Sequence, residues 1–186
     1  MSEMTILVDM DDVIEELGTA WVTYLNEKYN QNVNWYENRE YDFHKVFPTL
    51  TEDQIYGPLT DPDMWETVKA KEDAIYYVNK LITEGYDVYI VTSARYDSVE
   101  PKVVHCLLKY FPEFHYGHII VAKYKQMIKG DILIDDNINN FGGQAVGVLF
   151  SSPHNLDITN LPANVVRADN WAEVYGIIST IKLLKN

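Results

Sequence analysis

Two aspartates near the N-terminus stand where a short apolar strand is expected to end. The apolar run Thr5–Val8 is typical of a buried strand, and Asp9 and Asp11 follow it directly. Residues two apart on an extended chain share a face, so these carboxylates would repel each other unless a cation or a proton intervenes. The chain has 28 acidic residues, so an Asp-x-Asp also arises by chance. Placed at a strand end, the pair predicts a hard metal ion such as Mg²⁺, with one acid left for chemistry.

Two further motifs follow predicted strands. Asp135 and Asp136 come directly after the apolar residues 132–134. Carboxylates at the end of a buried strand are costly unless they are paired or bind a metal. Thr92 and Ser93 follow the predicted strand at residues 86–91. Their hydroxyls and the neighbouring backbone N–H groups suit a phosphate, although a helix cap is an equally simple explanation.

Cationic side chains accompany these motifs. Lys125 precedes Asp135 by ten residues and could reach a phosphate, or neutralise the acids, as a point charge. Lys123 and Lys129 are alternatives for the same task, and Arg95 and Lys123 are weaker candidates for phosphate contact.

Strands and helices alternate along most of the chain, which predicts an α/β fold with a mostly parallel sheet and helices on both faces. Strands are expected at residues 4–9, 86–91, 118–121, 132–134 and 145–150, and helices at 16–29, 74–83, 98–111 and 170–184. Residues 15–70 break this rhythm and hold many aromatic side chains. We therefore expect a core of residues 1–14 and 71–186, with a small helical cap of residues 15–70 inserted after the first strand.

Composition narrows the function classes. The 186 residues are 47% hydrophobic and lack an apolar run long enough to cross a membrane. A net charge of −13 argues against a long nucleic acid as partner but allows a small phosphorylated molecule beside a metal ion. Cys106 is the only cysteine and lies in an apolar stretch, so we expect a buried structural thiol and a cytoplasmic protein. A homodimer is one expectation for its assembly.

Taken in order, the four motifs resemble the signature of the haloacid dehalogenase superfamily of phosphotransferases. They are Asp9-Met-Asp11, Thr92-Ser93, Lys125 and Asp135-Asp136, and they extend over most of the chain. The resemblance implies a Rossmann-like core of the kind found in that superfamily.

The short chain, the helical insert and the sequence around these motifs resemble the 5′(3′)-deoxyribonucleotidase family more closely. Such a resemblance implies hydrolysis of deoxyribonucleoside monophosphates, with Met64 and Trp65 lining the base pocket. The chain departs from the family in three places. Asp12 stands where many members have Gly, Ala94 where many have Pro, and Glu15-Glu16-Leu17 replaces an Ala-Asp-aromatic segment.

The resemblance also implies roles for the acids. Asp9 would be the nucleophile that forms an aspartyl-phosphate, and Asp11 the general acid and base. Mg²⁺ would be held by Asp9, by the backbone carbonyl of Asp11 and by Asp136, while Asp135 would orient the water shell of the metal.

Thr92 and Lys125 would bind the phosphate oxygens, with Ser93 supporting their loop. Two other functions stay open: a phosphatase of the same superfamily for another small metabolite, and a non-catalytic nucleotide-binding regulator on the same fold. The histidines show no zinc-ligand spacing, and all five are expected to be structural or on the surface: His44, His105, His115, His118 and His154.

Overall fold

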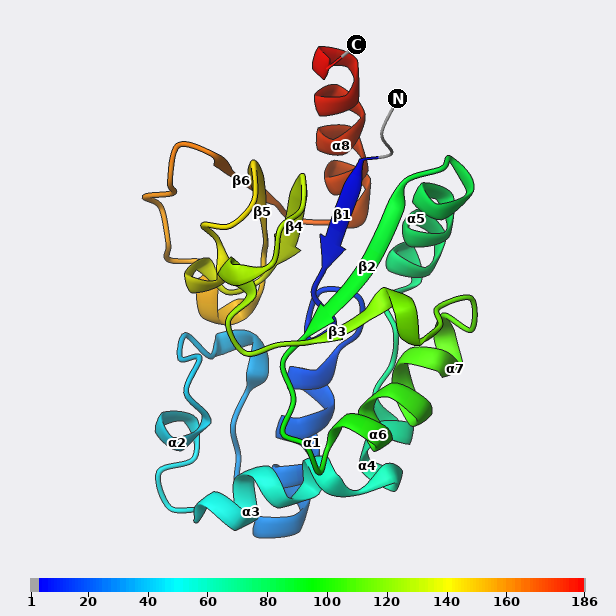
Figure 1. Cartoon of the computed structure of the whole chain (residues 1–186). Helices are drawn as coiled ribbons and strands as arrows, with labels where there is room; N and C mark the ends of the chain where they lie inside the picture. The colour runs from blue at the N-terminus through cyan, green and yellow to red at the C-terminus, as the bar shows by residue number, and fades with distance from the viewer. Residues whose placement is uncertain (1–3, 186) are drawn as a thin grey trace.

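The computed structural model describes residues 4–185, which are organised around a six-stranded sheet (Figure 1). The strand order is β3-β2-β1-β4-β5-β6, and every neighbouring pair is parallel. The strands are β1 (Thr5–Val8), β2 (Asp87–Thr92), β3 (Ile119–Val121), β4 (Ile132–Asp135), β5 (Val146–Phe150) and β6 (Val165–Ala168). The order reverses between β1 and β4, and in open parallel sheets ligands bind at the carboxyl ends of the strands beside such a reversal.

Helices α5 (Glu72–Thr83) and α8 (Trp171–Lys185) pack against each other and cover one face of the sheet. Alternation along β1 sends Ile6 and Val8 into this layer, where both are fully buried. Leu7 points to the other face, in a smaller cluster with Val91 and Leu133. This cluster packs against Tyr89, Ile120, Ile128 and Phe141. The connections on this face include two 3₁₀ helices, η5 (Lys125–Met127) and η6 (Ile138–Asn140).

Between β1 and α5 the chain forms a helical segment at the carboxyl edge of the sheet, residues 15–70, here called the insert (Figure 1). Its helices are α1 (Leu17–Tyr29), α2 (Phe43–Val46), α3 (Glu52–Tyr56) and α4 (Pro62–Thr67), with 3₁₀ turns η1 (Trp35–Glu37) and η2 (Gly57–Thr60). α3 begins with a capping box in which Thr51 and Gln54 satisfy each other's backbone N–H groups. Glu15 and Ala70 form an isolated antiparallel bridge where the insert leaves and rejoins the core.

The helix expected at residues 98–111 is not continuous. It consists of α6 (Val99–Lys102), a π-helical turn η3 (Val103–Leu107) and α7 (Leu108–Tyr110), and η3 packs against α4 of the insert. Cys106 is buried in this turn, as expected. Two further short turns, η4 (Tyr116–His118) and η7 (Pro153–Asn155), lie in connections of the core.

The five expected strands are all present, and β6 adds a sixth that was not expected. No helix within residues 4–185 has the length and apolar character needed to span a bilayer.

Candidate active site

Three aspartates meet where β1 and β4 end. Asp9, Asp135 and Asp136 are all buried, and one carboxylate oxygen from each lies within 4.8 Å of the others. The parallel pairing of β1 with β4 causes this meeting, since Val8 is in register with Ile134 and the next residues leave the sheet together. The amide of Asp9 also donates to the carbonyl of Ile134 at 2.9 Å.

Lys125 supplies the positive charge at this cluster. Its side chain is 2% exposed, and its Nζ lies 2.5 Å from Asp9 Oδ1 and 2.8 Å from Asp135 Oδ2. Burial opposes the charge on the amine, but the two carboxylates outweigh burial and raise the pKa of Lys125. Of the three lysines considered from the sequence, the structure brings Lys125 to the acids.

One lysine does not balance three carboxylates. Burial raises the pKa of Asp9 to about 7; Asp135 and Asp11 add to this rise, and Lys125 opposes it. Burial, followed by the charges of Asp9 and Asp135, also raises the pKa of Asp136. Oxygen donors with an excess of buried negative charge are the ligand set that hard divalent cations prefer, so these residues fit such an ion.

Asp135 is the most heavily hydrogen-bonded of the three acids. Its Oδ2 accepts from Lys125, and its Oδ1 accepts from the amide of Asn137 at 2.8 Å and from Nδ2 of Asn140 at 2.9 Å. Asp9 and Asp136 carry fewer such bonds and line the neighbouring cavity, which Asp135 does not. Asp135 therefore lies behind the two carboxylates that face the cavity.

Asp11 lies at the rim of the cluster and makes a contact that the sequence reasoning missed. Its Oδ2 accepts a 2.6 Å hydrogen bond from Lys102, a lysine that is 2% exposed. Lys102 also donates to the carbonyl of Ser93 at 3.2 Å. No signal in the sequence separates Lys102 from the other lysines of the chain, because the contact joins residues 91 positions apart.

The hydroxyl pair after β2 is divided between two environments. Thr92 is fully buried, and within residues 4–185 its Oγ1 has no hydrogen-bond partner. Ser93, by contrast, lines the cavity beside the acids. A buried hydroxyl without a partner is costly, so Thr92 is suited to a ligand that supplies one.

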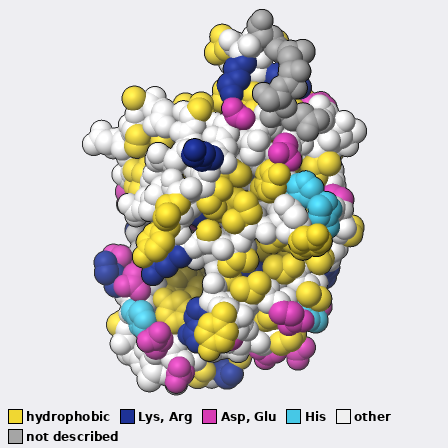
Figure 2. Space-filling view, in the orientation of Figure 1, with side chains coloured by type: hydrophobic (Ala, Val, Ile, Leu, Met, Phe, Trp, Pro, Cys, Tyr) yellow, Lys and Arg dark blue, Asp and Glu magenta, His cyan; other side chains and the backbone are white. Residues whose placement is uncertain are grey.

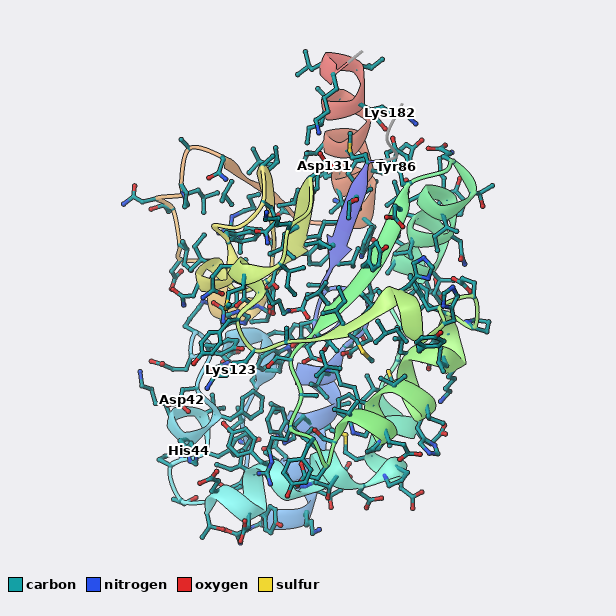
Figure 3. All side chains as sticks on the ribbon, in the orientation of Figure 1. Asp42, His44, Tyr86, Lys123, Asp131 and Lys182 are labelled. Atoms are coloured by element: carbon teal, nitrogen blue, oxygen red, sulfur yellow. The ribbon has the colours of Figure 1, made fainter. Side chains whose placement is uncertain are left out.

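The carboxylates open into a cavity of about 460 Å³ between the sheet and the insert, visible as a hollow with a hydrophobic wall in Figure 2. The insert contributes an aromatic wall of Trp21, Trp35, Tyr41, Phe43 and Tyr56. Trp21 and Phe43 are stacked with ring centroids 3.8 Å apart. The core contributes polar residues, mainly Lys123, Gln126, Asn137, Asn139 and Asn140. In Figure 3, Lys123 lies between the sheet and the part of the insert that carries Asp42 and His44.

The residues expected from the sequence in the base pocket, and one candidate for phosphate contact, lie away from the cavity. Met64 and Trp65 were expected in a base pocket, but they are 2% and 1% exposed and do not line the cavity. The Trp65 indole N–H donates to the carbonyl of Leu59 at 2.8 Å, which holds the ring in the core between α4 and its neighbours. Arg95 pairs with Asp97 at 2.9 Å, away from the cavity lining.

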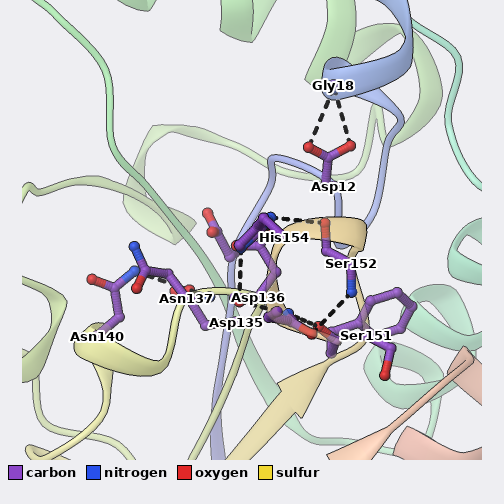
Figure 4. Close-up of polar contacts among 12 residues, drawn as sticks. Asp12, Gly18, Asp135, Asp136, Asn137, Asn140, Ser151, Ser152 and His154 are labelled. Carbon is purple, nitrogen blue, oxygen red and sulfur yellow. Dashed lines mark hydrogen bonds and ion pairs between the residues drawn. The ribbon is translucent and has the colours of Figure 1, made fainter. Parts of the chain in front are cut away.

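His154 and Asp12 also line the cavity, although neither was expected there from the sequence. His154 was expected to be structural or on the surface, yet its Nε2 lies 3.2 Å from the carbonyl of Asp136 and 3.7 Å from Asp136 Oδ2 (Figure 4). Burial lowers the pKa of His154. Asp12 has φ at 56°, in the left-handed region, and both of its carboxylate oxygens accept from the amide of Gly18, at 3.1 and 3.2 Å.

Solved structures of similar fold are hydrolases of the haloacid dehalogenase type. A hydrolase of this family from Deinococcus radiodurans, solved with phosphate and sodium bound, matches with a TM-score of 0.61 and 13% identity, covering 97% of each chain. A magnesium-bound hydrolase of the same type from Bacillus subtilis matches with a TM-score of 0.51 and 13% identity, covering 96% of this chain and 99% of that one.

Sequence relatives are more specific. A 5′(3′)-deoxyribonucleotidase of Bacillus subtilis is 31% identical over 172 residues, which cover 91% of this chain and 95% of the relative. One from Clostridium acetobutylicum is 27% identical over 185 residues, or 98% of each. Residues 3–184 match the family described as 5′ nucleotidase, deoxy (Pyrimidine), cytosolic type C protein. Its four motifs are gathered at the carboxyl edge of a sheet whose fold is that of haloacid dehalogenase-type hydrolases, and the chain belongs to this nucleotidase family.

Proposed function

We propose that the protein is a Mg²⁺-dependent phosphatase that hydrolyses deoxyribonucleoside 5′(3′)-monophosphates to a nucleoside and phosphate. The observation that carries the proposal is the buried cluster of Asp9, Lys125, Asp135 and Asp136 at the floor of an aromatic cavity, in a chain of this nucleotidase family. A protein that only binds a nucleotide would not need both a candidate nucleophile, Asp9, and a candidate general acid, Asp11.

The proposed reaction proceeds in two displacements. A carboxylate oxygen of Asp9 attacks phosphorus, the bond from phosphorus to the sugar oxygen breaks, and Asp11 gives its proton to that oxygen. Water then attacks the aspartyl-phosphate and loses a proton to Asp11, which releases phosphate and restores both acids. The net reaction consumes one water for each monoester.

The residues around Asp9 manage the charge of this reaction. Asp9, Asp136 and the backbone carbonyl of Asp11 would hold Mg²⁺, which would supply positive charge against the phosphate. Lys125 already contacts Asp9, so it stands where it can contact the oxygens of the transferring group. The hydroxyl of Thr92, which has no hydrogen-bond partner in the part of the chain that the structure describes, is a second donor for these oxygens, and Ser93 is a third.

The insert supplies the surface for the nucleoside. A volume of about 460 Å³ lies in the range of small-molecule sites, and aromatic rings of the kind found here stack on bases. We assign base contact to the wall that includes Phe43 and Tyr56, in place of Met64 and Trp65. The insert leaves and rejoins the core at the isolated Glu15–Ala70 bridge and lines the cavity, so residues 15–70 are proposed to act as a cap that excludes water.

Phosphate release from a panel of substrates tests the proposal. Deoxyribo- and ribonucleoside monophosphates and several sugar phosphates are incubated with Mg²⁺, with Asp9→Asn as the blank. Activity concentrated on deoxyribonucleotides is the expected result. Activity on sugar phosphates alone would retain the mechanism and replace the substrate, and no release from any substrate would favour a binding role.

A further inference from the structure

Lys102 is a buried charge that lies outside the four motifs of the family. It ends α6, immediately before the π-helical turn at Val103–Leu107, and its side chain is 2% exposed. Burying an ammonium group without partners is strongly unfavourable, so its contacts need an explanation. Turns of this π-helical kind occur often at functional sites.

All the polar contacts that the structure gives the Lys102 ammonium lead to the site. It donates to Asp11 Oδ2 at 2.6 Å and to the carbonyl of Ser93 at 3.2 Å, and it lies 5.6 Å from the ring centroid of Trp65. Lys102 thereby links the loop after β1 to the loop after β2, and the ring of Trp65, from the insert, packs near its ammonium group.

The surroundings of Asp11 explain what this contact does. Its other oxygen, Oδ1, has no hydrogen-bond partner within residues 4–185, and neither do the two buried carboxylate oxygens of Glu15 close by. The charge of Asp9 repels a carboxylate at this position. Burial, followed by the charges of Asp11 and Asp12, raises the pKa of Glu15 and favours its neutral form. Among the described residues, Lys102 makes the one ion pair to Asp11, so it is the charged contact that holds Oδ2 of this carboxylate in place.

We propose that Lys102 is a positioning residue that fixes the Asp11 carboxylate for proton transfer to the leaving oxygen and from the attacking water. This role rests on the proposed phosphatase function. Lys102 itself acts through Asp11 and does not line the cavity. Misplacement of a catalytic group by about 1 Å can cost on the order of 10²-fold in rate, so the effect should be large.

The test compares leaving groups, because a general acid matters most when the leaving oxygen is strongly basic. Lys102→Met is assayed on a deoxyribonucleoside monophosphate and on 4-nitrophenyl phosphate, whose leaving group departs without a proton. Lys109→Met is the matched control: this lysine follows on the same helical segment and pairs with Glu66 at 2.9 Å on the surface. We expect kcat on the nucleotide to fall by about 10²- to 10³-fold. On the aryl ester, a rapid first turnover should precede a slow steady state, because water activation is also impaired. Lys102→Arg should recover part of the loss, and Lys109→Met should stay within about twofold of wild type.

A double variant keeps the test decisive if Lys102→Met folds poorly, since Asp11→Asn/Lys102→Met leaves neither charge unpaired. A positioning role predicts that the double variant is within about threefold of Asp11→Asn alone. The proposal would be overturned if the activity losses of Asp11→Asn and Lys102→Met multiplied in the double variant. It would also be overturned if Lys102→Met changed only KM, or if it slowed the first turnover of both substrates equally. Failure of the wild type to release phosphate from either substrate would instead overturn the proposed function, and this role with it.

Discussion

Replacement of Lys125 by Met tests the electrostatic account of the site through stability alone. The substitution removes the ammonium that contacts Asp9 at 2.5 Å and Asp135 at 2.8 Å, and it retains most of the buried side-chain volume. Breaking a buried ion pair by removing one partner costs about 3–5 kcal/mol, because the remaining charge stays buried. For a chain of this size, that loss corresponds to a fall of about 6–20 °C in melting temperature.

The size of this loss should depend on pH. Burial raises the pKa of Asp9 from about 3.8 in the unfolded chain to about 7 in the folded protein, so the folded state binds a proton more tightly. Between these values, stability falls as pH rises. Lys125 opposes the rise, so its removal raises the pKa of Asp9 further and extends the fall in stability to higher pH. At pH 5.5 Asp9 is mostly protonated in both proteins, so about half of the loss seen at pH 8 should disappear.

Thermal and urea unfolding at pH 5.5 and 8 without divalent cations provide the measurement. Lys185→Met is the matched control, because Lys185 pairs with Asp131 at 2.5 Å but is 49% exposed, and exposed pairs contribute less than about 1 kcal/mol. A Lys125→Met loss below about 1 kcal/mol at pH 8, or one equal at the two pH values, would refute the claim that Lys125 offsets buried carboxylates.

Other expectations follow from the same contacts. Asp9→Asn should fold, release no phosphate, and melt higher than wild type by more at pH 8 than at pH 5, because it removes a carboxyl whose buried charge destabilises the folded state increasingly between about pH 4 and pH 7. Mg²⁺ should raise the melting temperature of the wild type more at pH 8 than at pH 5.5, since protons on Asp9 compete with the ion. The stabilisation from Asp12→Asn should likewise grow as pH rises from about 4 to about 7 and be complete above pH 7, because burial raises the pKa of Asp12 to about 7. Asn still accepts the Gly18 amide and tolerates positive φ. Tyr56→Ala should raise KM for a deoxyribonucleotide about tenfold and leave KM for a small aryl phosphate within about threefold of wild type. Trp65→Ala should instead lower the free energy of unfolding by about 3–5 kcal/mol, measured by urea unfolding.

The sequence was sufficient for the catalytic edge of the sheet because the argument there is local. Each motif follows its own strand, and parallel strands bring their carboxyl ends to one edge whatever the loops do. Asp9, Asp135 and Lys125 meet for this reason. Strand β6 was not predicted because it is four residues long and includes the charged residue Arg167. The Arg167 guanidinium donates to Asn155 and to the carbonyl of Ile158, contacts that the sequence alone does not reveal.

The aromatic residues of the insert show where local reasoning stops. Trp21 and Trp65 both lie in helices, both donate their indole N–H to a backbone carbonyl, and both are almost completely buried. Only Trp21 lines the cavity, because its ring stacks on Phe43, which α2 brings up from 22 residues further along the chain. The same holds for Lys102, whose partner Asp11 is reached only once α6 is placed beside the β1 loop. Catalytic residues at strand ends can therefore be predicted from their spacing, whereas substrate specificity and the positioning of Asp11 depend on how the helices pack. Substitutions at Trp21 and Phe43 should change substrate preference, and substitutions at Lys102 should change proton transfer, while the phosphate site stays intact.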